Sequence, residues 1–364
     1  MKLQHVSAFL EGKFPSYLQE DYDNSGWQLG DPQHQLTGVL VALDCTEAIV
    51  EEAIRKQCNL IIAHHPILFK GLKRLGVSSE IERIIHRCIK HDIAIYAIHT
   101  NLDNHIQGVN GKIAEKIGLH QCKILAPKGN TLFKLSFYTP VADQAKVHQA
   151  VCEAGAGMIG NYYNCGFSIE GKGTFTPNEF ANPTLGQAHV PTELTEVKME
   201  YVVSREKVHA VLDAAKNAHP YEEVAHEIIM LHNTNQEIGS GLIGQLNAPM
   251  DELAFLKQLK ETFQCEGIRH TALLGKPIQT VAVCGGAGSF LLADALRQKA
   301  DVFISGDFKY HEFFGAENRI LIADIGHYES EQYTSELIVG LIREKFPTFA
   351  VQLTENNTNP INFL

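Results

Sequence analysis

The sequence predicts an α/β fold in which a mainly parallel sheet, built from both ends of the chain, is interrupted by a smaller α+β domain. Three observations lead to this prediction. The 364 residues are enough for two domains, or for one large domain with an insertion. Short apolar runs alternate with helical patterns near the start and in the last third, which is typical of a parallel sheet covered by helices. The middle of the chain shows a different, β-rich pattern.

The two outer regions have the same rhythm of strand and helix. In the first, we expect strands at Leu36–Leu43, Asn59–Ala63 and Ile93–Ile98, and helices at Thr46–Gln57 and Ser79–His91. In the last third, we expect strands at Thr280–Val283, Val302–Ser305 and Arg319–Ala323, and helices at Phe290–Lys299 and from about Glu329 to Lys345. Buried runs of this kind favour parallel strands.

The middle region contains two β-rich stretches, each followed by a helix. Leu132–Tyr138 precedes a helix at Asp143–Ala154, Lys198–Val203 precedes one at Glu206–His219, and turns and hairpins are expected from Cys165 to Gly186. Two β-α-β-like halves suggest a ferredoxin-like module. We therefore expect a discontinuous α/β domain from residues 1–125 and 236–364, and an inserted α+β domain from 126–235.

Composition excludes several classes of protein. Lys+Arg total 31 and Asp+Glu total 42, a net charge of −11, which argues against general nucleic-acid binding but leaves room for a local nucleotide pocket. No apolar run approaches the roughly 18 residues of a membrane span, and the start has no signal-peptide core. The eight cysteines form no CxxC pair. Reduced thiols and a cytoplasmic location are therefore expected.

Polar clusters follow four of the predicted strands. His64 and His65 come directly after Asn59–Ala63, at the end of a strand where α/β sheets place ligands. A histidine pair alone also fits structural or surface histidines. Both imidazoles serve one site only if the chain turns here, because neighbouring residues of an extended strand face opposite sides.

The second cluster follows Ile93–Ile98 and contains His99 and Asp103, which offers a hard oxygen ligand beside the imidazoles. It also fits a polar turn that caps a helix starting near Val109. The third follows Arg319–Ala323, where His327 and Glu331 are four residues apart and so share one face of a helix. A helix N-terminus explains the acids of this cluster but not the histidine.

The fourth cluster follows Val302–Ser305. Asp307, Lys309 and His311 are candidates to contact substrate or to support metal ligands, although a helix cap with solvated neighbours explains Lys309 equally well. All four strand ends share one edge if the sheet is parallel. Three histidines and two carboxylates from these clusters are more than one tetrahedral site needs. Two ions bridged by a carboxylate are therefore expected, with zinc, iron or manganese favoured by the mixed nitrogen and oxygen ligands.

Two other segments carry less weight. Cys284–Ser289 is rich in glycine and lies between a strand and a helix, where backbone amides can bind phosphate. It matches neither the Walker pattern nor the dinucleotide fingerprint, so a tight turn is favoured. The stretch Asp23–Trp27 is expected to form a turn that could also line the pocket. There is no GxSxG motif for a nucleophilic serine.

These motifs resemble the GTP cyclohydrolase 1 type 2 homologue family, also called NIF-three-like. The matching pieces are Asp23-Asn24-Ser25-Gly26, Leu43-Asp44-Cys45-Thr46, His64-His65-Pro66, His99-Thr100-Asn101-Leu102-Asp103, Gly108-Val109-Asn110, Gly306-Asp307 with Tyr310-His311, and Asp324-Ile325-Gly326-His327 with Ser330-Glu331. The middle resembles the PII- and CutA-like insertion of the longer bacterial members, through Gly157-Met158-Ile159-Gly160-Asn161-Tyr162, Gly171-Lys172-Gly173-Thr174-Phe175 and His219-Pro220-Tyr221-Glu222-Glu223.

The resemblance implies a two-metal site with zinc as the first candidate and His64, His65, Asp103, His327 and Glu331 as ligands. It implies that His65 and Asp103 hold one ion, that His64 and His327 hold the other, and that Glu331 bridges them. It further implies a toroidal homohexamer and, through the name, GTP ring opening.

Two hypotheses about function follow. The first is a metal-dependent hydrolase for a nucleotide or related small molecule, with His99 or His311 as proton shuttle and Lys309 steadying an anionic group. The second is a non-catalytic metal-handling or regulatory protein whose inserted domain senses a ligand.

Overall fold

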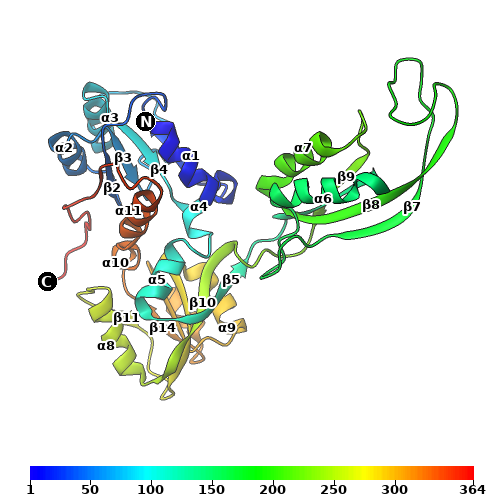
Figure 1. The fold of residues 1–364 in the computed structure, drawn as a ribbon. Helices are drawn as coiled ribbons and strands as arrows, with labels where there is room; N and C mark the ends of the chain where they lie inside the picture. Colours follow the sequence, from blue (N-terminus) through cyan, green and yellow to red (C-terminus); the bar gives the residue numbers. More distant parts are fainter. The chain divides into compact units, whose positions relative to one another are not determined.

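The computed structural model describes all 364 residues. The chain forms two compact units, one from Met1–Pro127 and Glu237–Leu364 and the other from Lys128–Gln236. We call the first the two-sheet unit and the second the middle unit, and each is described by itself (Figure 1). All eight cysteines are free thiols.

The first sheet of the two-sheet unit has five strands in the order β1-β4-β3-β2-β15. β2, β3, β4 and β15 run parallel, and β1 pairs antiparallel with β4. The strands are β1 (Gly26–Leu29), β2 (Val39–Ala42), β3 (Leu60–Ala63), β4 (Ala94–Ala97) and β15 (Val351–Leu353). The helices that connect them are α2 (Glu47–Arg55) and α3 (Glu80–Lys90). Ser79 caps α3 through a reciprocal pair with Glu82, which fixes where this helix begins.

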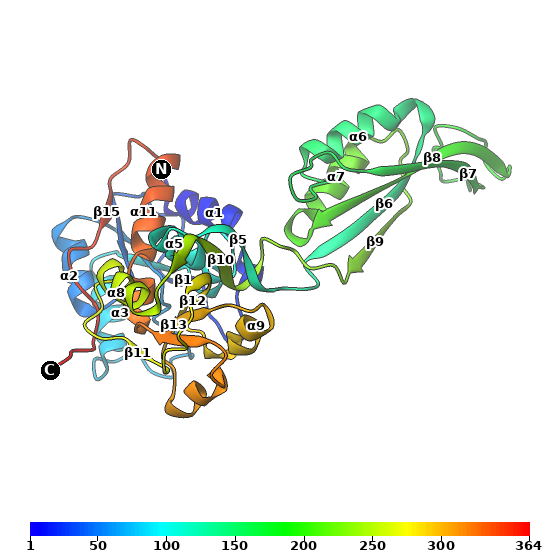
Figure 2. The same cartoon turned by 90° about the horizontal axis from the view of Figure 1, so that it is seen from below.

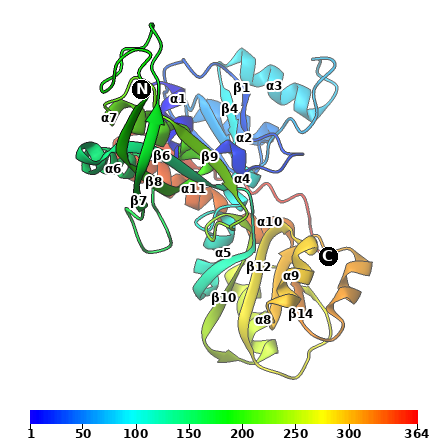
Figure 3. The ribbon, with the colours of Figure 1, turned by 90° about the vertical axis from the view of Figure 1, so that its right-hand side faces the viewer.

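The second sheet has six strands in the order β11-β14-β13-β12-β10-β5. Only β12, β13 and β14 are parallel to one another, and the other pairings are antiparallel. The strands are β5 (His120–Pro127), β10 (Gly239–Met250), β11 (Arg269–His270), β12 (Ile278–Ala287), β13 (Val302–Gly306) and β14 (Leu321–Asp324). Helix α9 (Leu292–Arg297) packs on one face of this sheet, beside β12 and β14 (Figure 3).

One core joins the two sheets. Alternate residues of each strand face it, such as Val39 and Val41 of β2 and Val281 and Val283 of β12, while their neighbours Leu40 and Ala282 face separate clusters. This is the two-residue period of a strand buried on both faces. The helices that contribute to the shared core are α1 (Leu3–Lys13), α5 (Val109–Ile117), α8 (Glu252–Thr262) and α11 (Thr334–Lys345).

The expectation of one mainly parallel sheet is wrong. The predicted strands are present, but those of the first third lie in one sheet and those of the last third in another, and several antiparallel strands join the second sheet. The runs of both groups are short, apolar and fully buried, so their sequence does not tell which strands pair. The four strand ends therefore do not share one sheet edge.

One predicted element also differs from the structure. The helix expected from about Glu329 to Lys345 is divided into α10 (His327–Glu331) and α11. Gln332 lies at the break, where its side chain donates to the carbonyl oxygens of Phe263 at 2.8 Å and Glu329 at 3.2 Å. The segment from Cys165 to Gly186 contains a nine-residue strand that pairs antiparallel with the next strand, in agreement with the expected turns and hairpins.

The middle unit holds four antiparallel strands in the order β7-β8-β6-β9. The strands are β6 (Leu132–Pro140), β7 (Phe167–Phe175), β8 (Thr192–Ser204) and β9 (His226–Leu231). Helices α6 (Gln144–Glu153) and α7 (Val208–Ala218) pack together on one face of this sheet (Figure 2). Along the chain the order is β6-α6-β7-β8-α7-β9.

Candidate metal centre

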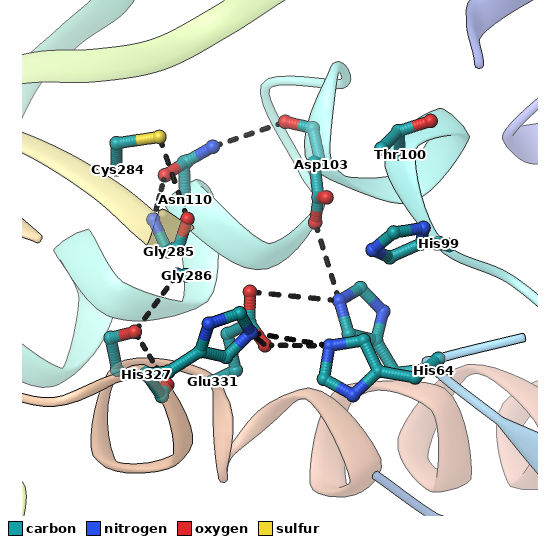
Figure 4. A network of polar contacts seen from close by, with 12 residues as sticks. His64, His99, Thr100, Asp103, Asn110, Cys284, Gly285, Gly286, His327 and Glu331 are labelled. Carbon is teal, nitrogen blue, oxygen red and sulfur yellow. Dashed lines mark hydrogen bonds and ion pairs between the residues drawn. The ribbon is translucent and has the colours of Figure 1, made fainter. Parts of the chain in front are cut away.

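The predicted ligands meet inside the two-sheet unit, although they come from two different sheets. His64 and His65 follow β3, and Asp103 ends the short helix α4 (Thr100–Asp103) after β4. His327 and Glu331 lie at the two ends of α10, which follows β14 of the second sheet. Figure 4 shows the side chains of His64, Asp103, His327 and Glu331 pointing toward one another.

His64 is fully buried and has one of its two ring nitrogens satisfied. Its Nδ1 lies 2.8 Å from the carbonyl oxygen of Ile98. Its Nε2 has no hydrogen-bond partner and lies 3.5 Å from Oδ1 of Asp103 and 3.8 Å from Oε1 of Glu331. Burial lowers the pKa of this imidazole, which favours the neutral ring that binds a metal.

His65 and His327 approach the other oxygen of Glu331. Nε2 of each ring lies 3.1 Å from Oε2 of Glu331, and the two Nε2 atoms are 3.4 Å apart. Burial opposes protonation, but the neighbouring carboxylates of Asp44 and Glu331 raise the pKa of His65 to about 10. Glu331 and Asp307 likewise raise the pKa of His327 to about 9. Protons and a metal ion would therefore compete for these nitrogens.

The two carboxylates at the centre have opposite pKa shifts. Burial alone would raise the pKa of Glu331, but the three neighbouring histidines lower it well below its usual range. For Asp103, burial and the charge of Glu331 both raise the pKa. Oδ1 of Asp103 and Oε2 of Glu331 have no hydrogen-bond partner within the usual geometry. Buried polar atoms left in this way are uncommon and are typical of positions that bind a ligand.

The histidines are oriented by acceptors on the side away from Glu331. Nδ1 of His65 lies 2.8 Å from Asp44, and Nδ1 of His327 lies 2.8 Å from Asp307. Carboxylate and carbonyl oxygens only accept hydrogen bonds, so Nδ1 of each ring carries a proton. Nε2 of His64, His65 and His327 therefore faces the cluster. Support of this kind is what metal-binding histidines have in known sites.

The cluster contains overlapping groups that could hold a metal ion. His65, His327 and Glu331 form one group, and His64, Asp103 and Glu331 form another. In each, the ligand atoms all lie within 4.8 Å of one another, and Glu331 belongs to both. This pairing differs from the expected one, in which His65 shared an ion with Asp103. The reason is the turn after β3, which directs His65 toward α10 and leaves His64 facing Asp103.

His99 lies beside this cluster and forms a dyad with an aspartate. Its Nδ1 is 2.7 Å from Oδ1 of Asp23, and the other oxygen of Asp23 accepts hydrogen bonds from the backbone and the hydroxyl of Thr100. Burial alone would raise the pKa of Asp23, but these hydrogen bonds lower it far below its usual range. His99 also forms a possible metal-binding group with His64 and His65.

The glycine-rich end of β12 packs against α10 and has its amides occupied. The backbone N–H of Gly285 donates to Asn110 at 3.0 Å, and that of Gly286 donates to Ser330 at 2.9 Å. Gly286 has a φ of +61°, and a Cβ there would collide with Oε1 of Glu331. These amides are used to pack the end of β12 against α10. The tight turn expected over Cys284–Ser289 begins only at Gly288, because β12 continues to Ala287.

A cavity of about 610 Å³ opens onto the cluster. His65, His99, Asp103, His327 and Glu331 all line it, together with the exposed aromatic rings of Tyr22, Phe69 and Phe290. No Lys or Arg lines this cavity. Lys309 and His311 are not among its lining residues either. His311 is exposed and contacts the rings of Tyr310 and Phe314.

Sequence reasoning missed the role of Asp44, which holds His65. Asp44 stands in the motif Leu43-Asp44-Cys45-Thr46, which assigned it no role, and it lies two residues after β2, at a third strand end of the first sheet. Asp307, by contrast, was a candidate to support a ligand, and it contacts His327 as described above. Thr358, which donates to Asp44 at 2.7 Å, gave no signal because 314 positions separate the two residues.

Fold and cluster together define a class of protein with mixed α/β sheets and a group of His, Asp and Glu side chains that could hold a metal ion. The model of the Duf34/NIF3 (NGG1p interacting factor 3) family matches residues 1–360, and the chain belongs to this family. No helix is both long and apolar enough to cross a membrane.

Several relatives match over their full length. A protein of Halalkalibacterium halodurans named GTP cyclohydrolase 1 type 2 homolog is 37% identical over 366 residues, which cover 99% of this chain and 98% of that protein. A protein of Bacillus subtilis with the same name is 35% identical over 366 residues, with the same coverage. The crystal structure of a Bacillus cereus protein related to NIF3 has a TM-score of 0.89 at 34% identity, covering 100% of this chain and 99% of that one.

Proposed function

We propose that this protein is a metal-dependent hydrolase that holds two divalent ions and acts on a nucleotide or a related small molecule. One observation carries the proposal: buried ligand atoms of His64, Asp103 and Glu331 without a hydrogen-bond partner lie in one cluster beside a cavity. A buried polar atom without a partner is costly, and binding a cation at this point would remove that cost.

The donor set fits transition metals. Imidazole nitrogens and carboxylate oxygens in this proportion suit zinc first, and iron or manganese as alternatives. His65 and His327 would hold one ion, His64 and Asp103 the other, and Glu331 would offer one oxygen to each. Two divalent ions in such a site activate a water and polarise the substrate oxygen.

His99 is the candidate for proton transfer. Its Nδ1–H donates to Asp23, which leaves Nε2 free to accept or return a proton beside the cluster. Asp23 stays ionised because its other oxygen is held by Thr100, and it therefore fixes the tautomer of His99. Lys309 and His311 lie outside the cavity lining, and no role is proposed for them.

The cavity also bears on the substrate. The relatives named GTP cyclohydrolase 1 type 2 homolog suggest a purine nucleotide. The rings of Tyr22, Phe69 and Phe290 offer apolar contacts to a base. Since no Lys or Arg lines the cavity, contacts to a phosphate group would fall to the metal ions.

The test is a nucleotide panel with zinc, manganese or iron, using wild-type protein, His65→Ala, Glu331→Ala and His99→Gln. We expect turnover by the wild type only in the presence of metal and a loss of at least about 100-fold in both ligand variants. His99→Gln should keep its metal content and lose about 100-fold in rate. Turnover by a verified metal-free Glu331→Ala protein would contradict the proposal.

A second candidate is a regulatory or metal-handling protein whose middle unit binds a ligand. The order β6-α6-β7-β8-α7-β9 is that of a ferredoxin-like module, and a PII- or CutA-like role for this unit is part of this proposal. The unit has its own cavity of about 460 Å³, lined by Tyr138, Phe175, Glu196 and Tyr221 among others. Metal transfer to an acceptor protein without turnover of any nucleotide would favour this candidate.

The family resemblance also motivates a homohexamer as the functional assembly. Light scattering of the purified protein tests this proposal. A mass of six chains of 40.4 kDa is expected, and a monomer at micromolar concentration would contradict it.

A further inference from the structure

The segment that follows β15 lies against the residues that support the candidate metal centre. β15 pairs with β2, and the backbone N–H of Thr354 continues this pairing by donating to Val41 at 3.0 Å. Beyond it, Asn356 and Thr358 are half-buried, whereas Glu355 and Asn357 are exposed. The chain bends at Glu355 and Asn356, and every second side chain from Thr354 to Thr358 is turned inward.

The first inward contacts anchor the segment to α2. Glu52 is fully buried and accepts hydrogen bonds from the hydroxyl of Thr354 at 2.5 Å and the amide of Asn356 at 2.6 Å. It also accepts from the backbone of Glu355 at 3.0 Å. These contacts place the next inward residue, Thr358, at the carboxyl end of the first sheet.

Thr358 contacts Asp44, the carboxylate that orients His65. Its hydroxyl donates to Oδ2 of Asp44 at 2.7 Å, while Oδ1 of the same carboxylate accepts from Nδ1 of His65 at 2.8 Å. Both oxygens of Asp44 are thereby fixed, and so is the plane of the carboxylate. The orientation of His65, whose Nε2 is 3.1 Å from Glu331, depends on that plane.

The next residue reaches the other sheet. Nδ2 of Asn359 donates to Oε1 of Glu329 at 2.9 Å. Glu329 is 8% exposed and lies on α10 between His327 and Glu331. Two consecutive residues therefore contact both halves of the site. Thr358 contacts Asp44, which follows β2, and Asn359 contacts α10, which follows β14.

We propose that residues 354–359 form a strap that positions the metal ligands, with Thr358 and Asn359 as its positioning residues. Thr358 acts on His65 through Asp44, and Asn359 acts on His327 and Glu331 through Glu329. The strap ties together ligand-bearing elements of two sheets, whose relative position decides the distances between ligands. This inference rests on the proposed metal centre, but it does not depend on which reaction the centre performs.

Coupling of this kind is reciprocal. If a closed strap strengthens metal binding, bound metal must stabilise the closed strap by the same factor. Amide hydrogen exchange in residues 354–359 should therefore slow when metal is added. The factor of slowing should equal the factor by which opening the strap weakens metal binding. A segment that is merely part of the fold would exchange at the same rate with and without metal.

The first experiment is a Co²⁺ titration of the full chain, followed by absorption and by competition with a chelator. The variants are Thr358→Val, Thr358→Ser and Asn359→Ala, with Asn362→Ala as the control because its side chain contacts only the nearby Pro360. We expect Thr358→Val and Asn359→Ala to weaken Co²⁺ binding about tenfold with an altered Co²⁺ spectrum. Thr358→Ser and Asn362→Ala should match the wild type.

The outcomes separate the strap from the metal centre. If the wild type binds no Co²⁺, the metal centre itself is wrong and the strap has nothing to position. If the wild type binds Co²⁺ and folded Thr358→Val binds it equally well with an unchanged spectrum, the strap proposal is overturned while the metal centre stands. Should Thr358→Val fail to fold, hydrogen exchange of the wild type decides: metal-dependent protection of residues 354–359 supports the strap, and unchanged exchange overturns it.

Discussion

Hydrogen bonds on the outer ring nitrogens determine what the histidines of this cluster present to its centre. Asp44, Asp307 and the carbonyl of Ile98 each accept a hydrogen bond from Nδ1 of one ring. The Nε2 atoms of the three rings are therefore turned inward. Removing one of these acceptors changes the orientation of the histidine that it holds, although that histidine itself is not substituted. Function at this scale depends on residues that hold ligands as well as on the ligands.

The residue types of the cluster were visible in the sequence, whereas their supports largely were not. Spacing alone places His327 and Glu331 on one helical face, and strand ends indicate His64, His65 and Asp103. Asp44 and His65 are 21 positions apart and meet only because β2 and β3 are neighbours. Which of these side chains lie closest together also required the structure, because a turn sets the direction of His65.

Gly286 provides a prediction at the residue scale. Gly286→Ala should destabilise the protein by about 1–2 kcal/mol, because an L residue is disfavoured at a φ of +61°. It should also weaken Co²⁺ binding, since the added Cβ displaces Glu331. Chemical denaturation and metal titration measure the two effects. Gly340→Ala in α11, where nothing lies within 4 Å, is the control and should not lower stability. Normal metal binding by Gly286→Ala would contradict the close approach to Glu331.

Individual elements were predicted better than their partners. The apolar runs gave β2, β3, β4, β12, β13 and β14 within a few residues, whereas the other strands of the two sheets were not predicted. The reciprocal Ser79–Glu82 cap of α3 agrees with the expected start of that helix. Which strands pair was not readable, because buried runs from the two sheets have the same composition. The division between α10 and α11 escaped prediction because it depends on a contact from Gln332 to the distant Phe263.

The contact between α2 and the strap gives a prediction of pH dependence. Burial opposes ionisation of Glu52, but hydrogen bonds from Lys56 and residues 354–356 lower its pKa to about 2. A lowered folded pKa stabilises the protein above the unfolded value of about 4.5, and this stabilisation is lost as pH falls toward 2. The contribution is about 1–3 kcal/mol.

Denaturation of chelator-treated protein between pH 5 and about 2 measures this contribution. The free energy of unfolding should fall less steeply for Glu52→Gln than for the wild type. Glu115→Gln is the control, because that carboxylate is largely exposed and pairs only with Lys112 at the surface. An identical slope for wild type and Glu52→Gln would show that Glu52 is not held in its ionised form.

For the whole molecule, the structure separates the candidate metal centre from the middle unit. Every residue of the cluster lies in the two-sheet unit, and so do all residues of the strap. Pro127 and Gly239 are paired neighbours in the β5–β10 ladder, so a short turn can close the gap that removal of the middle unit would leave.

Replacing residues 128–236 by such a turn should therefore leave metal stoichiometry and affinity unchanged. Co²⁺ titration and circular dichroism of the shortened protein check this expectation. Loss of metal binding in a folded shortened protein would show that the middle unit contributes to the site. Any ligand binding that belongs to the middle unit should disappear together with its cavity.

The central claim is that Glu331 lies between two ions, and anomalous diffraction from crystals grown with zinc tests it most directly. The account predicts two peaks per chain, one among His65, His327 and Oε2 of Glu331, the other among His64, Asp103 and Oε1 of Glu331. They should lie roughly 3.5–4 Å apart. A single peak, or peaks away from Glu331 at full zinc occupancy, would contradict it.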